Sequence, residues 1–342
     1  MRSKLSILLP YIILSALCLS LFSLPAAAVE GDEVLEDQLG GLIPGLMDKK
    51  IGKLEFDIVG SDTMGYESNY NLDRYDEDSS LFMQDTIGIY TRYPLIDNVC
   101  TLRTSYDFIW LRYFEDSEPN LADNMVGVGI DTQIADGYLW SLDYLADFVT
   151  FPHDKEINYV SNHIGTSITH DITDWLYQRI SYEFSYKRYS KWKITNNQGN
   201  FFMGDREDKK NSVSHQFGLF VNDKTSITTD NEIYYNDSTE QFLQYYDYKS
   251  YRGGITVNHV ATEKLYGSVN FGYQYKAYDK RSVSDRQRDQ RDHLFIYGGS
   301  LFYDVIPSVS IGTTVDYRNN VSYENDQQYE DLMISSGVYW MF

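Results

Sequence analysis

The sequence predicts an all-β chain in which about fourteen strands close into an antiparallel transmembrane barrel. Three observations lead to this fold. Apolar and polar residues alternate with a period of two along most of the chain, a leader of the export type stands at its start, and the links between the alternating segments are short and long in turn. Together they favour a barrel in a membrane over a soluble two-sheet sandwich, which is the alternative fold for such a pattern.

The first 28 residues have the build of a secretory signal peptide. Arg2 and Lys4 precede an apolar run, and the alanines at 26–28 form a small-residue cleavage site. An uncleaved membrane anchor is the alternative. We expect cleavage after Ala28, and no later stretch reaches the roughly 20 apolar residues that a membrane helix needs. The sequence therefore predicts an exported chain that does not cross a membrane with helices.

Segment 29–52 differs in kind from the rest of the chain. Its apolar residues recur at roughly helical spacing and are interrupted by two glycines and a proline. The apolar positions are Val34, Leu35, Leu39, Leu42, Ile43, Leu46 and Met47. Two interpretations stay open for this segment: a small plug inside the barrel, or a periplasmic tail of little order.

The barrel itself is predicted to occupy residues 53–342. Its clearest strand is "LYGSVNFGYQYK", in which Leu265, Val269 and Phe271 point one way while Asn270 and Gln274 point the other. High tyrosine and scarce proline fit long, uninterrupted strands, since proline cannot donate to a ladder. The predicted strands lie near 53–71, 82–96, 101–114, 122–135, 139–151, 159–172, 176–193, 209–222, 225–238, 245–260, 264–280, 291–306, 309–323 and 329–342.

The links between these segments alternate in length. Short ones such as "IDNV", "TDW" and "IPSV" take turns with longer polar ones such as "FEDSEPNLA", "NNQGNFFMGDRED" and "DKRSVSDRQRDQRD". Bacterial outer-membrane barrels have an even number of strands, short periplasmic turns and long outer loops. The pattern therefore places the short links in the periplasm and the long links outside the cell.

The chain ends in an apolar row with a terminal aromatic residue. Val338, Trp340 and Phe342 share one face of the last predicted strand. This end resembles the C-terminal strand of Gram-negative outer-membrane β-barrel proteins, and the resemblance implies the outer membrane as the location and the barrel assembly machinery as a partner that recognises these three residues. The strand count resembles that of fourteen-stranded monomeric porins and fatty-acid channels, and of the barrel in surface lipoprotein assembly modulators, although no helical repeat precedes it here. The tyrosine-rich barrel also looks like the barrel porins encoded beside exopolysaccharide clusters.

Composition excludes several classes of function. A net charge of −21 and a pI near 4.6 argue against nucleic acid as a partner. Only Cys100 follows the leader, so no intramolecular disulfide is expected. None of the six histidines stands in a hydrolase motif, and His163 and His170 are seven residues apart on a strand, which puts them on opposite faces. We expect no catalytic residue, no metal site and no cofactor.

The polar row of each strand is predicted to line the lumen. The acidic residues of these rows are Glu55, Asp57, Asp107, Asp131, Asp143, Asp147, Glu183, Asp230, Glu232 and Asp316, and the basic ones are Arg92, Arg103, Arg179, Lys187, Arg252, Lys276 and Arg318. Such a lumen is mixed in charge and mildly favours cations or neutral solutes. The alternative is that these charges pair across the wall and stiffen it.

Two functions follow from this reading. The first is a porin-like channel for passive diffusion of small hydrophilic solutes or for export of a polysaccharide. The alternative is a non-conducting barrel that serves as a structural, receptor or assembly partner. We expect a monomer in contact with outer-membrane lipid and with lipopolysaccharide. The basic loop 279–292 would meet lipopolysaccharide phosphates or fold inward and attract an anionic polymer; a solvated loop whose charges pair with one another is the alternative.

Overall fold

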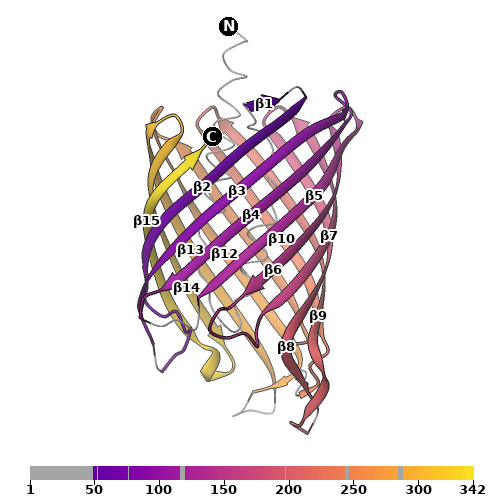
Figure 1. Cartoon of the computed structure of the whole chain (residues 1–342), viewed down its shortest axis with the longest axis vertical. Helices are drawn as coiled ribbons and strands as arrows, with labels where there is room; N and C mark the ends of the chain where they lie inside the picture. Colours follow the sequence, from indigo (N-terminus) through magenta and orange to yellow (C-terminus); the bar gives the residue numbers. More distant parts are fainter. Residues whose placement is uncertain are drawn as a thin grey trace.

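The computed structural model describes residues 49–342 apart from 52, 76, 116–119, 197, 243–245 and 284–287. In this part of the chain, fourteen long strands form one closed antiparallel barrel (Figure 1), which confirms the predicted fold class. The expected signal peptide at 1–28 and most of segment 29–52 lie outside the described residues. Closure pairs every strand on both sides, so the backbone of the wall has no open edge and can stand in a medium that offers no hydrogen bonds.

Each of the fourteen predicted segments corresponds to one strand of the barrel. The strands are β2 (Leu54–Glu67), β3 (Ser80–Ile96), β4 (Cys100–Tyr113), β5 (Leu121–Ala135), β6 (Tyr138–Thr150), β7 (Tyr159–Thr173), β8 (Leu176–Thr195), β9 (Phe201–Asn222), β10 (Thr225–Ser238), β11 (Tyr248–Val260), β12 (Leu265–Ser282), β13 (Asp289–Ile306), β14 (Val309–Ser322) and β15 (Tyr329–Met341). Consecutive strands are neighbours throughout, so the chain runs up and down around the wall.

The two ends of the barrel differ in their connections. One end, the short-turn end, carries brief turns in which Asn98 and Gly137 adopt positive φ values of 60° and 72°, as tight turns between strands require. The opposite end, the long-loop end, carries most of the longer connections, and the C-terminus lies at the short-turn end (Figure 1). A short 3₁₀ turn, Asn325–Gln327, belongs to the last of these loops.

Two of the predicted long loops are shorter than expected. β9 begins at Phe201 rather than near 209, so only residues 196–200 connect it to β8. β12 continues to Ser282, and β13 begins at Asp289. The basic loop predicted over 279–292 is therefore shorter than expected. β8 and β9 project beyond the other strands at the long-loop end (Figure 1), and there they pair as strands only with each other.

The first and last strands of the barrel close the wall. β15 pairs with β2 from Met333 opposite Glu67 to Met341 opposite Val59. Phe342 continues this pairing, because its N–H donates to the carbonyl of Ile58 at 2.8 Å and its carbonyl accepts from the N–H of Ile58 at 2.9 Å. The terminal residue is therefore part of the seam.

A short strand that the sequence pattern did not predict precedes the barrel. β1 (Lys49–Ile51) pairs antiparallel with residues Leu54–Phe56 of β2. Because β3 occupies the other edge of β2 from Glu55 onward, β1 uses the same edge as β15, at the short-turn end. The sheet therefore begins four residues before the expected boundary at 53.

Candidate functional site in the barrel lumen

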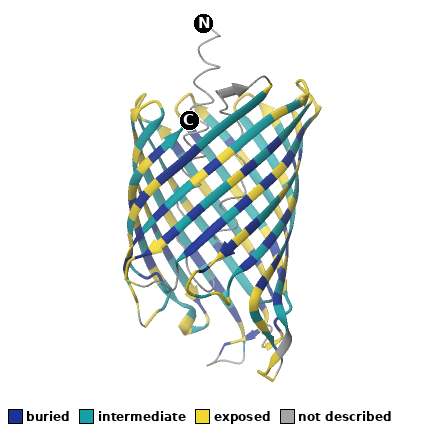
Figure 2. Ribbon diagram, viewed as in Figure 1, coloured by how far each residue is buried: buried dark blue, intermediate teal, exposed yellow. Residues whose placement is uncertain are grey.

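The burial pattern separates a lipid face from a lumen face on every strand. Exposed positions on one row are apolar, such as Val126, Ile180 and Val269 at 48 %, 55 % and 60 % exposure, whereas polar residues on the other row, such as Asp131 and Lys187, are 8 % and 7 % exposed (Figure 2). A closed barrel with an apolar outer row is a structure for lipid, since in water those side chains would remain unburied.

Tyrosines on the outward face have polar partners for their hydroxyl groups. Four of these hydroxyls donate to an asparagine on a neighbouring strand: Tyr106 to Asn124 at 3.0 Å, Tyr144 to Asn162 at 2.7 Å, Tyr182 to Asn211 at 2.8 Å and Tyr251 to Asn231 at 3.1 Å. A tyrosine ring can therefore face lipid without an unpaired hydroxyl group. Val338, Trp340 and Phe342 lie on this outward face too, and their role as an assembly signal stays a prediction.

All seventeen residues that the sequence predicts for the lumen lie on the inward rows. In β12 the same register puts Asn270 and Gln274 inward and Phe271 and Tyr273 outward, as the period of two predicts. The inward row is the one that contains buried polar residues such as Ser61, Asp131 and Asp316. That each of these residues meets water in an open pore stays a prediction.

One group of the predicted residues forms an ion-pair network near the short-turn end. Arg103 lies 2.8 Å from Asp131 and donates to Asp143 at 2.7 Å, while Arg92 lies 3.8 Å from Asp131. Ser141 donates to Asp131 at 2.7 Å. The two arginines and two aspartates largely neutralise one another within the wall. Here the structure agrees with the alternative interpretation, in which charged residues pair along the wall and stiffen it instead of selecting ions.

A second group leaves negative charge in the middle of the barrel. Among the described residues, Asp107, Asp230 and Asp316 form no ion pair, and each stands near the middle of its strand. Asp107 accepts a hydrogen bond from Tyr90, and Asp230 accepts one from Gln216 at 2.7 Å. Neutral donors hold these carboxyl groups in place without cancelling their charge. The midsection of the described barrel therefore carries three inward carboxyl groups that lie within no ion-pair distance of a cation, although Arg252 and Arg318 stand near two of them.

Toward the long-loop end the lumen carries a belt of cations over tyrosine rings, which we call the cation–tyrosine belt. Its pairs are Lys187 over Tyr159 at 4.2 Å, Arg206 over Tyr246 at 3.3 Å, Lys210 over Tyr234 at 4.5 Å, Lys276 over Tyr248 at 5.1 Å and Arg281 over Tyr278 at 5.0 Å, measured to the ring centroid. Cations at these distances are attracted to the negative face of the ring. The belt runs across β7 to β12, and buried carboxylates accompany its cations: Arg206 donates to Asp208 at 2.6 Å.

The strands that adjoin the belt in the same half carry an apolar cluster, which also contains Tyr159 of the belt. Ile109, Leu111, Leu121, Met125 and Val149 are inward residues of β4, β5 and β6, and each is only 2–5 % exposed. We call this cluster the apolar wall. The sequence pattern missed it because these strands carry apolar residues on both faces at this level. Arg206 and Lys210 of the belt were also missed, since Arg206 stood in an expected loop and Lys210 at the uncertain start of its strand.

Three inward side chains resemble a hydrolase triad in their contacts. The Oγ of Ser161 lies 2.8 Å from Nε2 of His163, whose Nδ1 lies 3.2 Å from Oε1 of Glu183. A nucleophile must also reach a substrate and an oxyanion donor. Ser161 is 0 % exposed, and its strand pairs with both neighbours around this position. We therefore assign these contacts to the packing of the wall.

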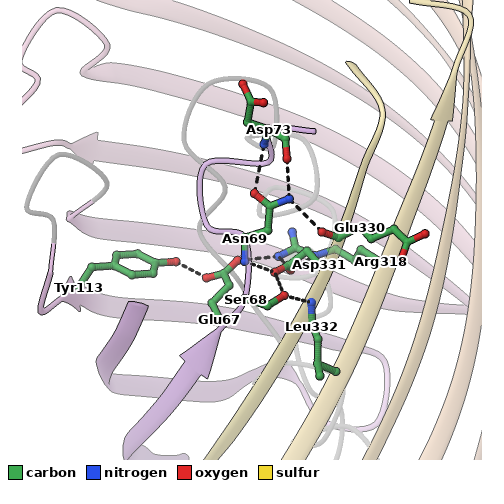
Figure 3. A network of polar contacts seen from close by, with 9 residues as sticks. All are labelled: Glu67, Ser68, Asn69, Asp73, Tyr113, Arg318, Glu330, Asp331 and Leu332. Carbon is green, nitrogen blue, oxygen red and sulfur yellow. Dashed lines mark hydrogen bonds and ion pairs between the residues drawn. The ribbon is translucent and has the colours of Figure 1, made fainter. Parts of the chain in front are cut away.

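A buried ionic cluster stabilises the long-loop end of the seam, which is the place where β15 pairs with β2 (Figure 3). Arg318 of β14 donates to Glu67 of β2 at 2.8 Å and to Asp331 of β15 at 2.7 Å, and these three side chains are 0–3 % exposed. Tyr113 donates to the other oxygen of Glu67, and the backbone N–H of Asn69 donates to Asp331 at 3.1 Å. The cluster thus ties together the start and the end of the barrel.

Among residues 49–342, outside the gaps given above, no group of three or more histidine, cysteine, aspartate or glutamate side chains could hold a metal ion. In the same part of the chain no helix is both long and apolar enough to cross a membrane.

No protein-family model matches the chain, and comparison with curated protein sequences finds no significant match. Solved structures do share its fold. The outer-membrane-expressed OmpT of Vibrio cholerae has a TM-score of 0.50 at 9 % identity and covers 86 % of this chain and 99 % of its own. The outer membrane channel DcaP of Acinetobacter baumannii has a TM-score of 0.51 at 8 % identity, covering 86 % and 99 %, and OprB of Pseudomonas putida has 0.50 at 7 %, covering 85 % and 94 %.

Identity this low speaks for the fold and not for a particular solute. The closed fold and the apolar outer face nevertheless both indicate a lipid bilayer as the environment of the barrel, because its outward apolar row is buried only in lipid. The protein is therefore a closed transmembrane β-barrel, and its fold is that of outer-membrane porins.

Proposed function

We propose that the protein is an outer-membrane channel through which small hydrophilic solutes diffuse passively, with cations and neutral solutes favoured over anions. Fourteen tilted strands about 4.8 Å apart give a backbone cylinder on the order of 28 Å across. Eight strands just fill with side chains and sixteen leave an aqueous channel, so fourteen leave room for a pathway.

The observation that carries this proposal is the midsection of the lumen. Asp107, Asp230 and Asp316 keep carboxyl groups at the middle of three strands without an ion-pair partner among the described residues, whereas the charges near the short-turn end cancel one another. Fixed carboxylates in a narrow aqueous pore raise the local concentration of cations and lower that of anions.

Purified protein in a planar bilayer tests the proposal. Stable conductance steps are expected, with a reversal potential in a salt gradient that reports preference for cations. Asp230→Asn and Asp316→Asn should each reduce that preference, while Asp97→Asn, at an exposed turn outside the lumen, should leave it unchanged. The absence of steps over many insertions would favour the non-conducting barrel, which acts as a structural, receptor or assembly partner.

Export of a polysaccharide is a second candidate, and the cation–tyrosine belt is the observation that favours it. Flat tyrosine rings can stack on the apolar faces of sugars, and neighbouring cations can pair with acidic groups on the polymer. An acidic oligosaccharide added from the long-loop side should then block the current at lower concentration than a neutral one of equal length. Equal block by both would remove the support for this candidate.

We further propose lipopolysaccharide as a neighbour of the outer rim. Arg291 lies on the outward row of β13 near the long-loop end, 3.8 Å from Asp289, and its guanidinium also donates to the carbonyls of Tyr278 and Gln290 at 2.8 Å. Two other basic residues of this loop also contact the protein: Arg281 belongs to the cation–tyrosine belt, and Arg288 lies 3.7 Å from the ring centroid of Tyr323. Fewer basic residues would therefore contact phosphate groups than the number in the whole loop suggests.

A further inference from the structure

We propose that copies of this barrel associate side by side in the membrane, with β2 of one copy against β9 of the next, so that they form rows. The proposal goes beyond the channel function and holds whether or not the lumen conducts. It is carried by polar side chains that lie on the outward face, within its apolar band and on opposite sides of the wall.

The first polar group lies on β2. Asp62 is an exposed outward residue, and along its row the apolar Ile58 and Met64 lie on either side of it. It stands directly opposite Asp85 of β3. Arg112 lies 3.8 Å from Asp85, and among the described residues no cation forms an ion pair with Asp62. A carboxylate in hydrocarbon is costly unless a partner satisfies it.

The second polar group lies on β9 and β10. His215 of β9 is an outward residue between Val213 and Phe217, and its nitrogens have no hydrogen-bond partner among the described residues. Its register partner is Asn231 of β10. The Oδ1 of Asn231 accepts from Tyr251, so its amide N–H groups remain to donate elsewhere. This face therefore offers hydrogen-bond donors within the apolar band.

The two groups lie on opposite sides of the barrel at similar depth. β9 is the seventh strand from β2 in either direction around the wall. Counted from the short-turn end of its strand, Asp62 is the ninth residue, His215 the eighth and Asn231 the seventh. A copy displaced sideways without rotation therefore brings its His215 against Asp62. Because unlike and opposite faces meet, further copies add in an open row and not in a closed ring.

The neighbouring strands are compatible with this contact. Two barrels with the same orientation in the membrane meet in opposite circular order, so β15 of one copy faces β10 of the next, and β3 faces β8. The first pairing puts Ser336 near Asn231, and the second puts Ile87 near Tyr182; all four are outward residues. The hydroxyl of Ser336 lies 2.9 Å from that of Thr313 and can accept from the amide of Asn231. Polar side chains that bond across a contact hold transmembrane segments together.

Cysteine cross-linking in outer-membrane fractions tests the contact. In a Cys100→Ser background, one chain carries Ile87→Cys and Tyr182→Cys, and mild oxidation should produce a ladder of dimers, trimers and longer oligomers. The matched control carries Val126→Cys and Val269→Cys, which are outward residues of β5 and β12 and also lie seven strands apart. The control should stay monomeric. Equal ladders from both pairs would indicate random collision and overturn the proposal.

Single cysteines test the direction of the contact. Ile87→Cys alone and Tyr182→Cys alone should not cross-link, whereas a mixture of the two variants should stop at dimers. Dimers from Ile87→Cys alone would mean that like faces meet, and would overturn the row. A cross-link to a different protein would overturn it as well. So would monomers in every variant, a result that would agree with the monomer expected from the sequence.

A charge exchange tests the pair itself. Copies labelled at Asp223→Cys in the Cys100→Ser background should show energy transfer in lipid vesicles above the level of a random distribution. Asp62→Val and His215→Asp should each bring the transfer down to that level, and the double variant Asp62→His, His215→Asp should restore it. Heat-modifiable gel mobility shows which variants are folded. A folded double variant that stays at the random level would overturn the pairing of Asp62 with His215.

Discussion

Removal of Arg318 should destabilise the barrel more than the loss of one hydrogen-bonded side chain usually does. Arg318 is 3 % exposed and is the shared partner of Glu67 and Asp331, which are 0 % and 1 % exposed. Breaking a buried ion pair by deleting one partner costs about 3–5 kcal/mol, because the remaining charge is left buried and uncompensated. Here two carboxylates lose their cation at once.

The remaining donors set the expected size of the effect. Glu67 keeps the hydroxyl of Tyr113, and Asp331 keeps the N–H of Asn69 and the hydroxyl of Ser68. Hydrogen bonds to charged groups contribute about 1.5–3 kcal/mol each, so these contacts partly compensate both carboxylates. We therefore expect Arg318→Met to lose about 3 kcal/mol, at the low end of the range for one broken pair rather than twice that amount.

Denaturant unfolding of protein refolded into lipid vesicles measures this loss, with gel mobility of unheated samples as the readout. Lys53→Ala is the matched control, because Lys53 lies the same 2.8 Å from Asp97 but that pair is exposed, and its midpoint should stay at the wild-type value. The triple variant Arg318→Met, Glu67→Gln, Asp331→Asn should regain most of the stability, since it leaves no buried charge. The reasoning fails if Arg318→Met matches the wild type, or if the triple variant is no more stable than the single one.

Three further predictions concern assembly, topology and register. Deletion of Phe342 should remove two backbone hydrogen bonds from the seam together with the terminal outward aromatic residue. The amount of protein in the outer membrane should then fall while export to the periplasm continues. A normal amount in an immunoblot of outer-membrane fractions would contradict this. With the barrel cysteine replaced by serine, a cysteine at Glu156 should label with an impermeant maleimide on intact cells and one at Asp223 should not, and equal labelling would exclude the assigned sidedness. Asn270→Arg should fold normally and shift ion preference toward anions, whereas Phe271→Arg should lose about 2–4 kcal/mol of folding stability near the membrane midplane; the reverse result in a refolding assay would mean that the faces are exchanged.

The wall could be predicted from the sequence because lipid imposes a period of two on every crossing. The register of β12, for instance, follows from the alternation in "LYGSVNFGYQYK" alone. Where a strand extends beyond the hydrocarbon, no lipid requires one of its faces to be apolar. The alternation of apolar and polar residues therefore disappears there. The pattern therefore predicts a start near 209 for β9, although the strand begins at Phe201. The residues from Gly204 to Asp208 are mostly charged on both rows, and nothing in their pattern distinguishes strand from loop.

The candidate site could be predicted only in part, for a related reason. Polar residues on an alternating strand reveal the inward row. An inward apolar residue cannot be told from a lipid-facing one, so the alternation does not identify Leu111 and Met125 as lumen residues. Partners across the wall depend on register and closure. Arg318 and Glu67 are 251 positions apart in the chain, and no local pattern links them. A single sequence therefore gives the members of a lumen and not their pairs.

The projecting β8–β9 hairpin separates the barrel from the surface that it shows to its surroundings. From Ser190 to Glu207 the two strands pair only with each other as strands, and the segment after β10 adds hydrogen bonds from Thr239 and Gln241. A two-stranded ribbon adds little stability by itself, and lengthening its tip costs little loop entropy. The closure of the wall does not depend on it. The tip of the hairpin, between Lys193 and Asp205, can therefore change in length without altering the strand pairing that closes the barrel.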